Sequence, residues 1–197
     1  DNAPEEIVKG AVEAAKEIED EIIIVGKPDA IEKQLKKCKY KGEQISIAPA
    51  NEVITMEDSP VKAIRHKKDS SLVVGLNMLK DGEGDAFLSA GNSGAVGAGS
   101  MFIVKRIKGV KRVAFAPVIP NMTGKFMLID SGINTDVRPT VLQQFAVMGF
   151  VYMNKVLGIE NPRVGLANVG TEEHKGDELR QETYKLLQKA PVNFIGN

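Results

Sequence analysis

The chain has 197 residues, enough for one large domain or two small ones, and 43% of them are apolar. Its 26 basic and 26 acidic residues give a formal net charge of zero, which argues against bulk binding to nucleic acid. Cys38 is the single cysteine, so an internal disulfide is excluded. No apolar run approaches the roughly 18 residues that suggest a membrane span.

Hydrophobic periodicity predicts helices that alternate with short strands along the chain. The predicted helices span residues 4–18, 28–37, 60–68, 71–80, 95–107, 139–156 and 177–189, and Ser59, Ser70 and Asp177 are predicted to cap the third, the fourth and the last of them. The predicted strands span residues 21–26, 44–48, 86–88, 113–116, 126–130, 163–168 and 192–195, with a turn at 121–124. We therefore expect an α/β fold, a largely parallel sheet with helices on both faces, in one domain of residues 1–197. Because the pattern opens on a helix and ends on a strand, we also expect a fragment of a longer chain.

The central feature is a glycine-rich turn at residues 91–94, between the predicted strand at 86–88 and the predicted helix at 95–107. Free backbone N–H groups at such a turn can hold an anion, and Ser89 and Asn92 add a hydroxyl and an amide. The glycine spacing fits neither the dinucleotide nor the P-loop fingerprint. An ordinary strand-to-helix turn, in which small residues allow close packing, explains the same pattern.

Polar residues also follow the predicted strand at 126–130, where Asp130 and Asn134 flank Gly132. If the strands ending at Ser89 and Asp130 are neighbours, their polar groups line one edge of the sheet. Asp130 is then a base, a carboxylate that orients a neighbour, or a turn former.

Several cations are candidates for binding anions. Arg65, Lys67 and Lys68 end a predicted helix, where they form either a solvated last turn or a patch for an anionic substrate or an acidic partner. Lys175 lies in a loop that follows a predicted strand, where it either offsets phosphate charge or is simply solvated. The two histidines, His66 and His174, belong to no zinc or hydrolase motif.

Ten short segments that carry a resemblance to a known family are spread from end to end of the chain. They are DNAP (1–4), DSPVKAIR (58–65), SAGNSGA (89–95), RIKG (106–109), AFAPVIP (114–120), DSGIN (130–134), QFAVMG (144–149), PRVG (162–165), GTE (170–172) and NFIGN (193–197). In order and spacing they resemble the bacterial phosphate acyltransferase family of phospholipid synthesis. The resemblance implies a fold similar to the isocitrate/isopropylmalate dehydrogenase and phosphotransacetylase group.

The resemblance also implies an activity: acyl-acyl carrier protein and inorganic phosphate give acyl phosphate, with no cofactor and no metal. Phosphate is expected at Gly91, Asn92, Ser93, Gly94 and Lys175. Ser89, Asn92, Asp130 and Asn134 are the expected catalytic residues, and Arg65, Lys67 and Lys68 are expected to dock the carrier protein.

The implied assembly is a cytoplasmic homodimer. It is expected to associate peripherally with the membrane, to pass its product to a membrane glycerol-phosphate acyltransferase, and to bind no nucleic acid.

The chain departs from the family pattern. The family's first strand and roughly its last two-fifths have no counterpart here, and Ser93, Ser131 and Ile133 stand where members usually have Thr, Val and Ala. Two other functions remain open. A dehydrogenase of the similar fold would need a nucleotide site, and a module that only binds the carrier protein would show no turnover.

Overall fold

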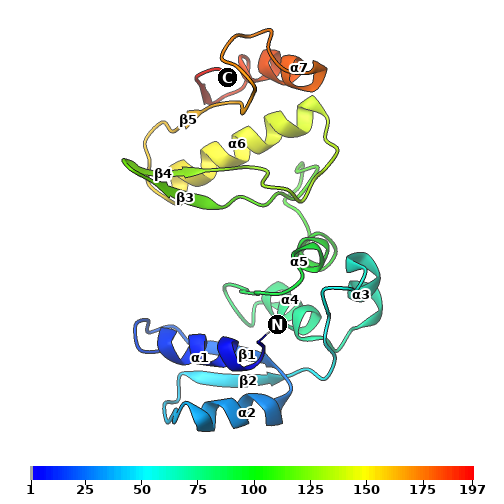
Figure 1. Cartoon of the computed structure of the whole chain (residues 1–197), viewed down its shortest axis with the longest axis vertical. Helices are drawn as coiled ribbons and strands as arrows, with labels where there is room; N and C mark the ends of the chain where they lie inside the picture. Colours follow the sequence, from blue (N-terminus) through cyan, green and yellow to red (C-terminus); the bar gives the residue numbers. More distant parts are fainter. Residues whose placement is uncertain (1) are drawn as a thin grey trace. The chain divides into compact units, whose positions relative to one another are not determined.

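A computed structural model describes residues 2–197, and contacts within the chain define two compact units, Asp1–Lys105 and Arg106–Asn197 (Figure 1). Asp1, the first residue of the DNAP segment, lies outside the described residues. The expectation of one domain over residues 1–197 stays a prediction.

The first unit begins with helix α1 (Glu5–Ala14), strand β1 (Ile22–Gly26), helix α2 (Pro28–Lys37) and strand β2 (Ile45–Pro49). All four were predicted. The strands pair in parallel, with Ile24 opposite Ile47. Ile24 packs with Val8 of α1 and Ile31 of α2, so both helices cover this face of the sheet.

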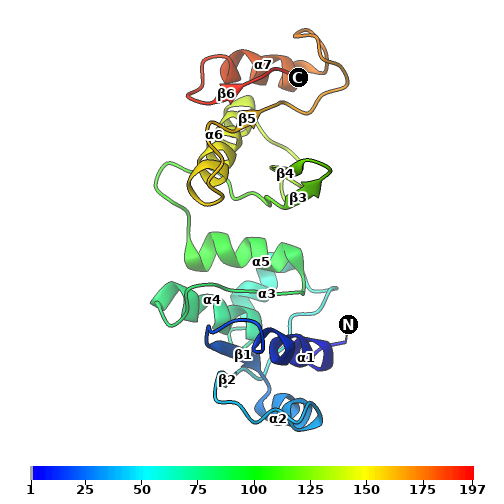
Figure 2. The same ribbon diagram turned by 90° about the vertical axis from the view of Figure 1, so that its left-hand side faces the viewer.

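Helix α4 (Ser71–Asp81) covers the opposite face of this sheet, where Gly75 lies against Val25. Ser70 caps α4, as predicted, by accepting a hydrogen bond from the Val73 N–H at 3.4 Å. Helices α3 (Pro60–His66) and α5 (Ser93–Gly99) pack beside α4 (Figures 1 and 2). The helical path of α5 continues directly into a π-helical turn, η1 (Ser100–Val104), so the predicted long helix is confirmed but changes its hydrogen-bonding pattern.

The strand predicted at residues 86–88 is wrong, because this segment is an irregular extended chain. Its aromatic ring at Phe87 packs against Gly75 of α4, whereas the Leu88 side chain is 98% exposed. No neighbouring strand within residues 2–197 pairs with it. An apolar triplet forms a buried strand only where a second backbone is available for hydrogen bonding.

The second unit starts with an antiparallel hairpin of β3 (Val118–Asn121) and β4 (Gly124–Met127). The predicted turn at 121–124 is confirmed. The strand predicted at 113–116 is wrong, and the one predicted at 126–130 is only partly right, since β4 starts earlier and ends at Met127. The chain reverses directly at the turn, so pairing starts there rather than in the more apolar segments on either side.

Helix α6 (Pro139–Lys155) is the core element of this unit, and α7 (Glu178–Leu187) packs against it. Short strands β5 (Arg163–Val164) and β6 (Asn193–Phe194) pair in parallel. They are much shorter than the predicted strands at 163–168 and 192–195, although both lie within them. Asp177 caps α7, as predicted, with its carboxylate accepting from the Arg180 N–H at 3.0 Å.

The α/β class is confirmed by helices and parallel strands in both units. The strands form three separate two-stranded sheets in the part of the chain that is described. The expected sheet edge carrying both Ser89 and Asp130 is absent there, because neither residue ends a strand and they belong to different units. No helix among residues 2–197 is long and apolar enough to cross a bilayer.

Shortening Phe145 to alanine tests whether α6 supports the second unit. The Phe145 side chain is 1% exposed, and Val151 on the same helix is 50% exposed. We expect Phe145→Ala to lower the free energy of unfolding by about 3–5 kcal/mol because it leaves a cavity. Val151→Ala should change it by about 0.5 kcal/mol or less. Equal losses in urea unfolding would show that α6 is not packed as described.

Candidate functional site

The glycine-rich turn is held by the side chain of Asn92, which is only 7% exposed. Its Oδ1 accepts a hydrogen bond from the Ala95 N–H at 3.0 Å and so caps α5. Its Nδ2 donates to the Thr55 carbonyl at 2.8 Å, a residue 37 positions earlier in the chain. Asn92 therefore fixes the start of α5 and ties it to the loop before α3.

The backbone N–H groups of Ser93 and Gly94 are the polar groups left open at this turn. Within residues 2–197, no hydrogen-bond acceptor is in range of either N–H, and both residues are exposed. Ser89 is exposed beside them, and its hydroxyl makes only long contacts within the turn, at 3.3 and 3.4 Å to Gly91. The turn thus offers two free donors at a helix start, the arrangement that favours an anion.

Close packing explains part of the glycine pattern. A Cβ on Gly94 would lie 2.7 Å from the Cγ of Pro60, the first residue of α3. A Cβ on Gly99 would overlap the side chain of Leu76 on α4. Gly91 has nothing within 4 Å of the position a Cβ would take, so packing does not require a glycine there. Close packing therefore explains Gly94 and Gly99 but not Gly91, and the anion-binding explanation stays a prediction.

An ion pair between Asp58 and Lys67 organises the loop that Asn92 contacts. The Lys67 ammonium lies 2.6 Å from Oδ2 of Asp58 and donates to the Val53 carbonyl at 2.8 Å. The same carboxylate oxygen accepts from the Thr55 N–H at 2.7 Å. The hydrogen bond from Lys67, followed by that from Thr55, lowers the pKa of Asp58.

Sequence reasoning missed this loop. It assigned Ser59 as the helix cap, but the Ser59 side chain makes no capping hydrogen bond. Asp58 and Lys67 are nine residues apart, which matches no helical or strand period. The proximity of an acid and a proline at a helix start was the only available signal.

The three residues expected to dock the carrier protein have different surroundings. Lys67 is committed to Asp58, and the Lys68 ammonium donates to the Ile64 carbonyl at 3.1 Å. Arg65 is exposed and has no polar partner in the part of the chain that is described. Of the three, Arg65 is therefore the most available to an acidic partner.

In the second unit, Asp130 accepts hydrogen bonds from three backbone N–H groups. Its carboxylate oxygens lie 2.8 Å from the Phe115 nitrogen, 3.4 Å from that of Ile133 and 2.8 Å from that of Asn134. The Asn134 amide donates to Asp130 and to the Val113 carbonyl. Burial raises the pKa of Asp130, but these hydrogen bonds outweigh burial and leave it below the ordinary value.

This arrangement makes Asp130 an organiser of the loop, the turn-forming role considered from the sequence. A carboxylate that is stabilised in its charged form is a weak base. Asn134 is joined to it, so the structure brings these two predicted residues together. Their catalytic role stays a prediction.

Lys175 also lies in the second unit, in the loop before α7. Its ammonium is 3.9 Å from the Glu172 carboxylate, and its backbone carbonyl accepts from Asn168 at 3.0 Å. The predicted site residues are therefore divided between the units. Those of the glycine-rich turn are in the first, whereas Asp130, Asn134 and Lys175 are in the second.

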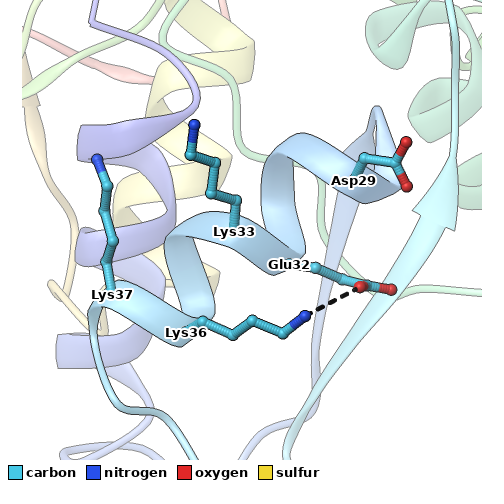
Figure 3. A pocket seen from close by; sticks show the side chains of 5 residues that line it. All are labelled: Asp29, Glu32, Lys33, Lys36 and Lys37. Atoms are coloured by element: carbon cyan, nitrogen blue, oxygen red, sulfur yellow. Dashed lines mark ion pairs between the residues drawn. The ribbon is translucent and has the colours of Figure 1, made fainter.

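A shallow hollow on α2 was not predicted and is no candidate site. Figure 3 shows its lining side chains, Asp29, Glu32, Lys33, Lys36 and Lys37, all from one helix and all exposed. The ammonium of Lys36 lies 3.9 Å from the Glu32 carboxylate. Solvated charges of both signs on one helix provide no enclosed surface for a ligand.

Comparison with known proteins assigns the chain to a family. Residues 1–197 match the family described as fatty acid synthesis protein. The chain belongs to this family. It is 52% identical over 197 residues to a Clostridium kluyveri protein named phosphate acyltransferase, and 50% identical over 198 residues to one of the same name from Acetivibrio thermocellus. It covers 59% and 58% of the length of these two relatives and is covered completely by both.

Solved phosphotransacetylases have a similar fold. The structure from Streptococcus pyogenes superposes with a TM-score of 0.76 at 18% identity, over 99% of this chain and 65% of that one. The structure from Staphylococcus aureus gives a TM-score of 0.68 at 17% identity, over 98% and 65%. The family assignment and the α/β fold expected from the sequence are thus confirmed.

Two glycine substitutions test where close packing requires a glycine at the turn. Gly94→Ala should lower the free energy of unfolding by about 1–3 kcal/mol, because its methyl group would overlap Pro60. Gly91→Ala, with open space around it, should change stability by about 0.5 kcal/mol or less. Thermal and urea unfolding measure both, and a harmless Gly94→Ala would remove the packing explanation.

Asp130→Asn tests the loop of the second unit. An amide there places N–H groups against backbone donors, so we expect a loss of about 1–3 kcal/mol at pH 7. Because the pKa of Asp130 is lowered in the folded state, its carboxylate stabilises the fold at any pH above its unfolded-state pKa, near 3.8. This stabilisation is lost as the pH falls through the pKa of the folded state. The variant should therefore show a shallower loss of stability below about pH 4.

Asp136→Asn is the control for this measurement, because Asp136 is exposed in the same loop and makes no hydrogen bond within the described residues. An equal effect from both substitutions would contradict the organising role of Asp130.

Proposed function

We propose that this chain carries the phosphate site of an enzyme that transfers an acyl group from acyl-acyl carrier protein to inorganic phosphate. The observation that carries the proposal is the pair of free N–H groups at Ser93 and Gly94, beside Ser89, in a member of the fatty acid synthesis protein family. Relatives named phosphate acyltransferase support the reaction class.

In the proposed reaction, a phosphate oxygen attacks the thioester carbonyl carbon. The new C–O bond forms, the C–S bond breaks, and the carrier-protein thiolate leaves. The nucleophile is the substrate itself, so no covalent acyl-enzyme is required. The contribution of the protein is to position two substrates and to stabilise the developing oxyanion.

The N–H groups of Ser93 and Gly94 bind phosphate in this proposal, helped by the positive end of the continuous α5–η1 helix. Ser89 donates its exposed hydroxyl, which the long contacts to Gly91 leave available. Asn92 acts as a positioning residue, because its Oδ1 and one Nδ2 hydrogen bond are used to hold the turn.

The remaining assignments are further parts of the proposal. In the second unit, Asp130 and Asn134 are the proposed catalytic residues, and Lys175 is a proposed phosphate ligand. The whole protein acts as a homodimer without a cofactor or a metal. It is cytoplasmic, associates peripherally with the membrane, and passes acyl phosphate to a membrane glycerol-phosphate acyltransferase.

The test is phosphate-dependent loss of acyl-acyl carrier protein, with acyl phosphate trapped by hydroxylamine. It is run on the 197-residue chain and on a version extended to the length of the curated relatives. Asn92→Ala in the extended version should lower turnover about 100-fold, since a misplaced turn misaligns phosphate. Asn77→Ala, the same chemical change on α4 of the same unit, is the control and should leave turnover near that of the unsubstituted protein.

Two outcomes would contradict the proposal. Absence of acyl phosphate from the extended protein would reject the reaction. Full turnover by Asn92→Ala would reject the glycine-rich turn as the phosphate site. Binding of carrier protein without turnover would favour a binding module, and reduction of a nicotinamide cofactor would favour a dehydrogenase.

A further inference from the structure

Charge is unevenly distributed along this electrically neutral chain. Between Asp85 and Asp130 the sequence contains no acidic residue, but it contains six cations. They are Lys105, Arg106, Lys108, Lys111, Arg112 and Lys125. Four of the six lie within residues 106–112 of the second unit, a segment we call the basic turn.

The basic turn has a defined conformation. The Val110 N–H donates to the Ile107 carbonyl at 3.0 Å, and Gly109 has a φ of 94°, which favours glycine. The Gln144 side chain on α6 holds both sides of the turn: its Oε1 accepts from the Lys111 N–H at 2.7 Å, and its Nε2 donates to the Gly109 carbonyl at 2.9 Å. The turn is therefore pre-organised for binding.

The cations of the basic turn are exposed and have no acidic partner. Within residues 2–197, none of them lies within 4.0 Å of a carboxylate. Arg106 donates to the Lys111 carbonyl, and the Lys111 ammonium lies 3.4 Å from the Thr140 hydroxyl. Lys108 and Arg112 make no polar side-chain contact in the described part.

Between these cations, Ile107 has 81% of its surface exposed. An exposed apolar residue surrounded by cations that have no acidic partner has the layout of a small protein-docking surface. By contrast, Lys67 of the docking patch expected from the sequence is already paired with Asp58.

We propose that the basic turn, residues 106–112, docks the acidic carrier protein that delivers the acyl group. This inference rests on the proposed function, because it supplies a docking surface for that reaction. The cations steer the acidic surface of the partner into place, and Ile107 forms the apolar contact at the centre.

An anionic lipid surface is the competing occupant, and the turn is less suited to it. Stable attachment to a membrane needs a large buried apolar area in addition to positive charge. The basic turn offers one large exposed apolar side chain, and its backbone is hydrogen-bonded to Gln144 of α6. Carboxylates on the surface of a protein can instead pair with its exposed cations.

The experiment measures the affinity of acyl carrier protein by fluorescence anisotropy at low and at physiological salt. It uses the 197-residue chain and the extended version, each with Lys108→Glu, Arg112→Glu or the control Lys125→Glu. Lys125 is an exposed lysine of β4, outside the basic turn. Arg65→Glu reports on the end of α3, and vesicles containing phosphatidylglycerol replace the carrier protein in a parallel series.

Reversing Lys108 or Arg112 should weaken carrier-protein binding about tenfold at low salt and reduce its salt dependence. Lys125→Glu should change affinity less than twofold. Unchanged binding by the Lys108 and Arg112 variants would overturn the inference, and a loss confined to Arg65→Glu would move docking to α3. Equal losses from all variants would show only general charge attraction. Lost vesicle binding with unchanged carrier-protein binding would assign the turn to lipid. Each of these outcomes would overturn the inference.

Circular dichroism spectra establish that each variant is folded before binding is measured. Turnover of the unsubstituted protein, assayed in parallel, separates the two proposals. If acyl phosphate forms but the variants bind normally, docking at the basic turn is wrong and the proposed function stands. If no acyl phosphate forms but the variants lose carrier-protein binding, docking at the basic turn stands and the proposed reaction is wrong.

Discussion

The glycine-rich turn of the first unit depends on one side chain, the buried amide of Asn92. Its oxygen caps α5 and its nitrogen holds the Thr55 carbonyl, so one residue connects a helix start to a loop 37 positions earlier. Asp58 and Lys67 stabilise the far side of that loop. Because Asn92 supplies the cap, the N–H groups of Ser93 and Gly94 stay open to a ligand. Structure and proposed function thus share one interaction.

Close packing accounts for part of the glycine-rich segment. Gly94 and Gly99 allow α5 to approach α3 and α4 closely, whereas Gly91 faces open space. In the second unit, Asp130 uses its carboxylate to hold backbone donors of its own loop, and its lowered pKa reflects those bonds rather than a role as a base. In both units a short polar side chain satisfies backbone groups that no strand or helix satisfies.

The sequence predicted helices better than strands. Helices such as α2 and α6 carry their own signals, a proline at the start and an apolar face, so their predicted bounds agree closely with the structure. Strands depend on neighbours. The segment at 86–88 has no paired strand within the described residues, and the segment at 113–116 is joined to a neighbour only by an isolated backbone hydrogen bond, from the Ser131 N–H to the Phe115 carbonyl at 2.9 Å. The same limit applies to the candidate site. The glycine-rich turn is a local feature that the sequence predicts. The contact from Asn92 to Thr55 and the Asp58–Lys67 ion pair join residues whose spacing matches no helical or strand period.

The most direct measurement of the central claim is a titration of the isotopically labelled chain with inorganic phosphate, followed by amide NMR. We expect saturable shifts of the Ser93 and Gly94 amide signals, because these two N–H groups are open at the start of α5. Chloride at matched ionic strength should leave them unchanged, and the signal of the Ala95 amide, which is capped by Asn92, should move less. Phosphate shifts confined to other residues, or none at all, would contradict a phosphate site at this turn.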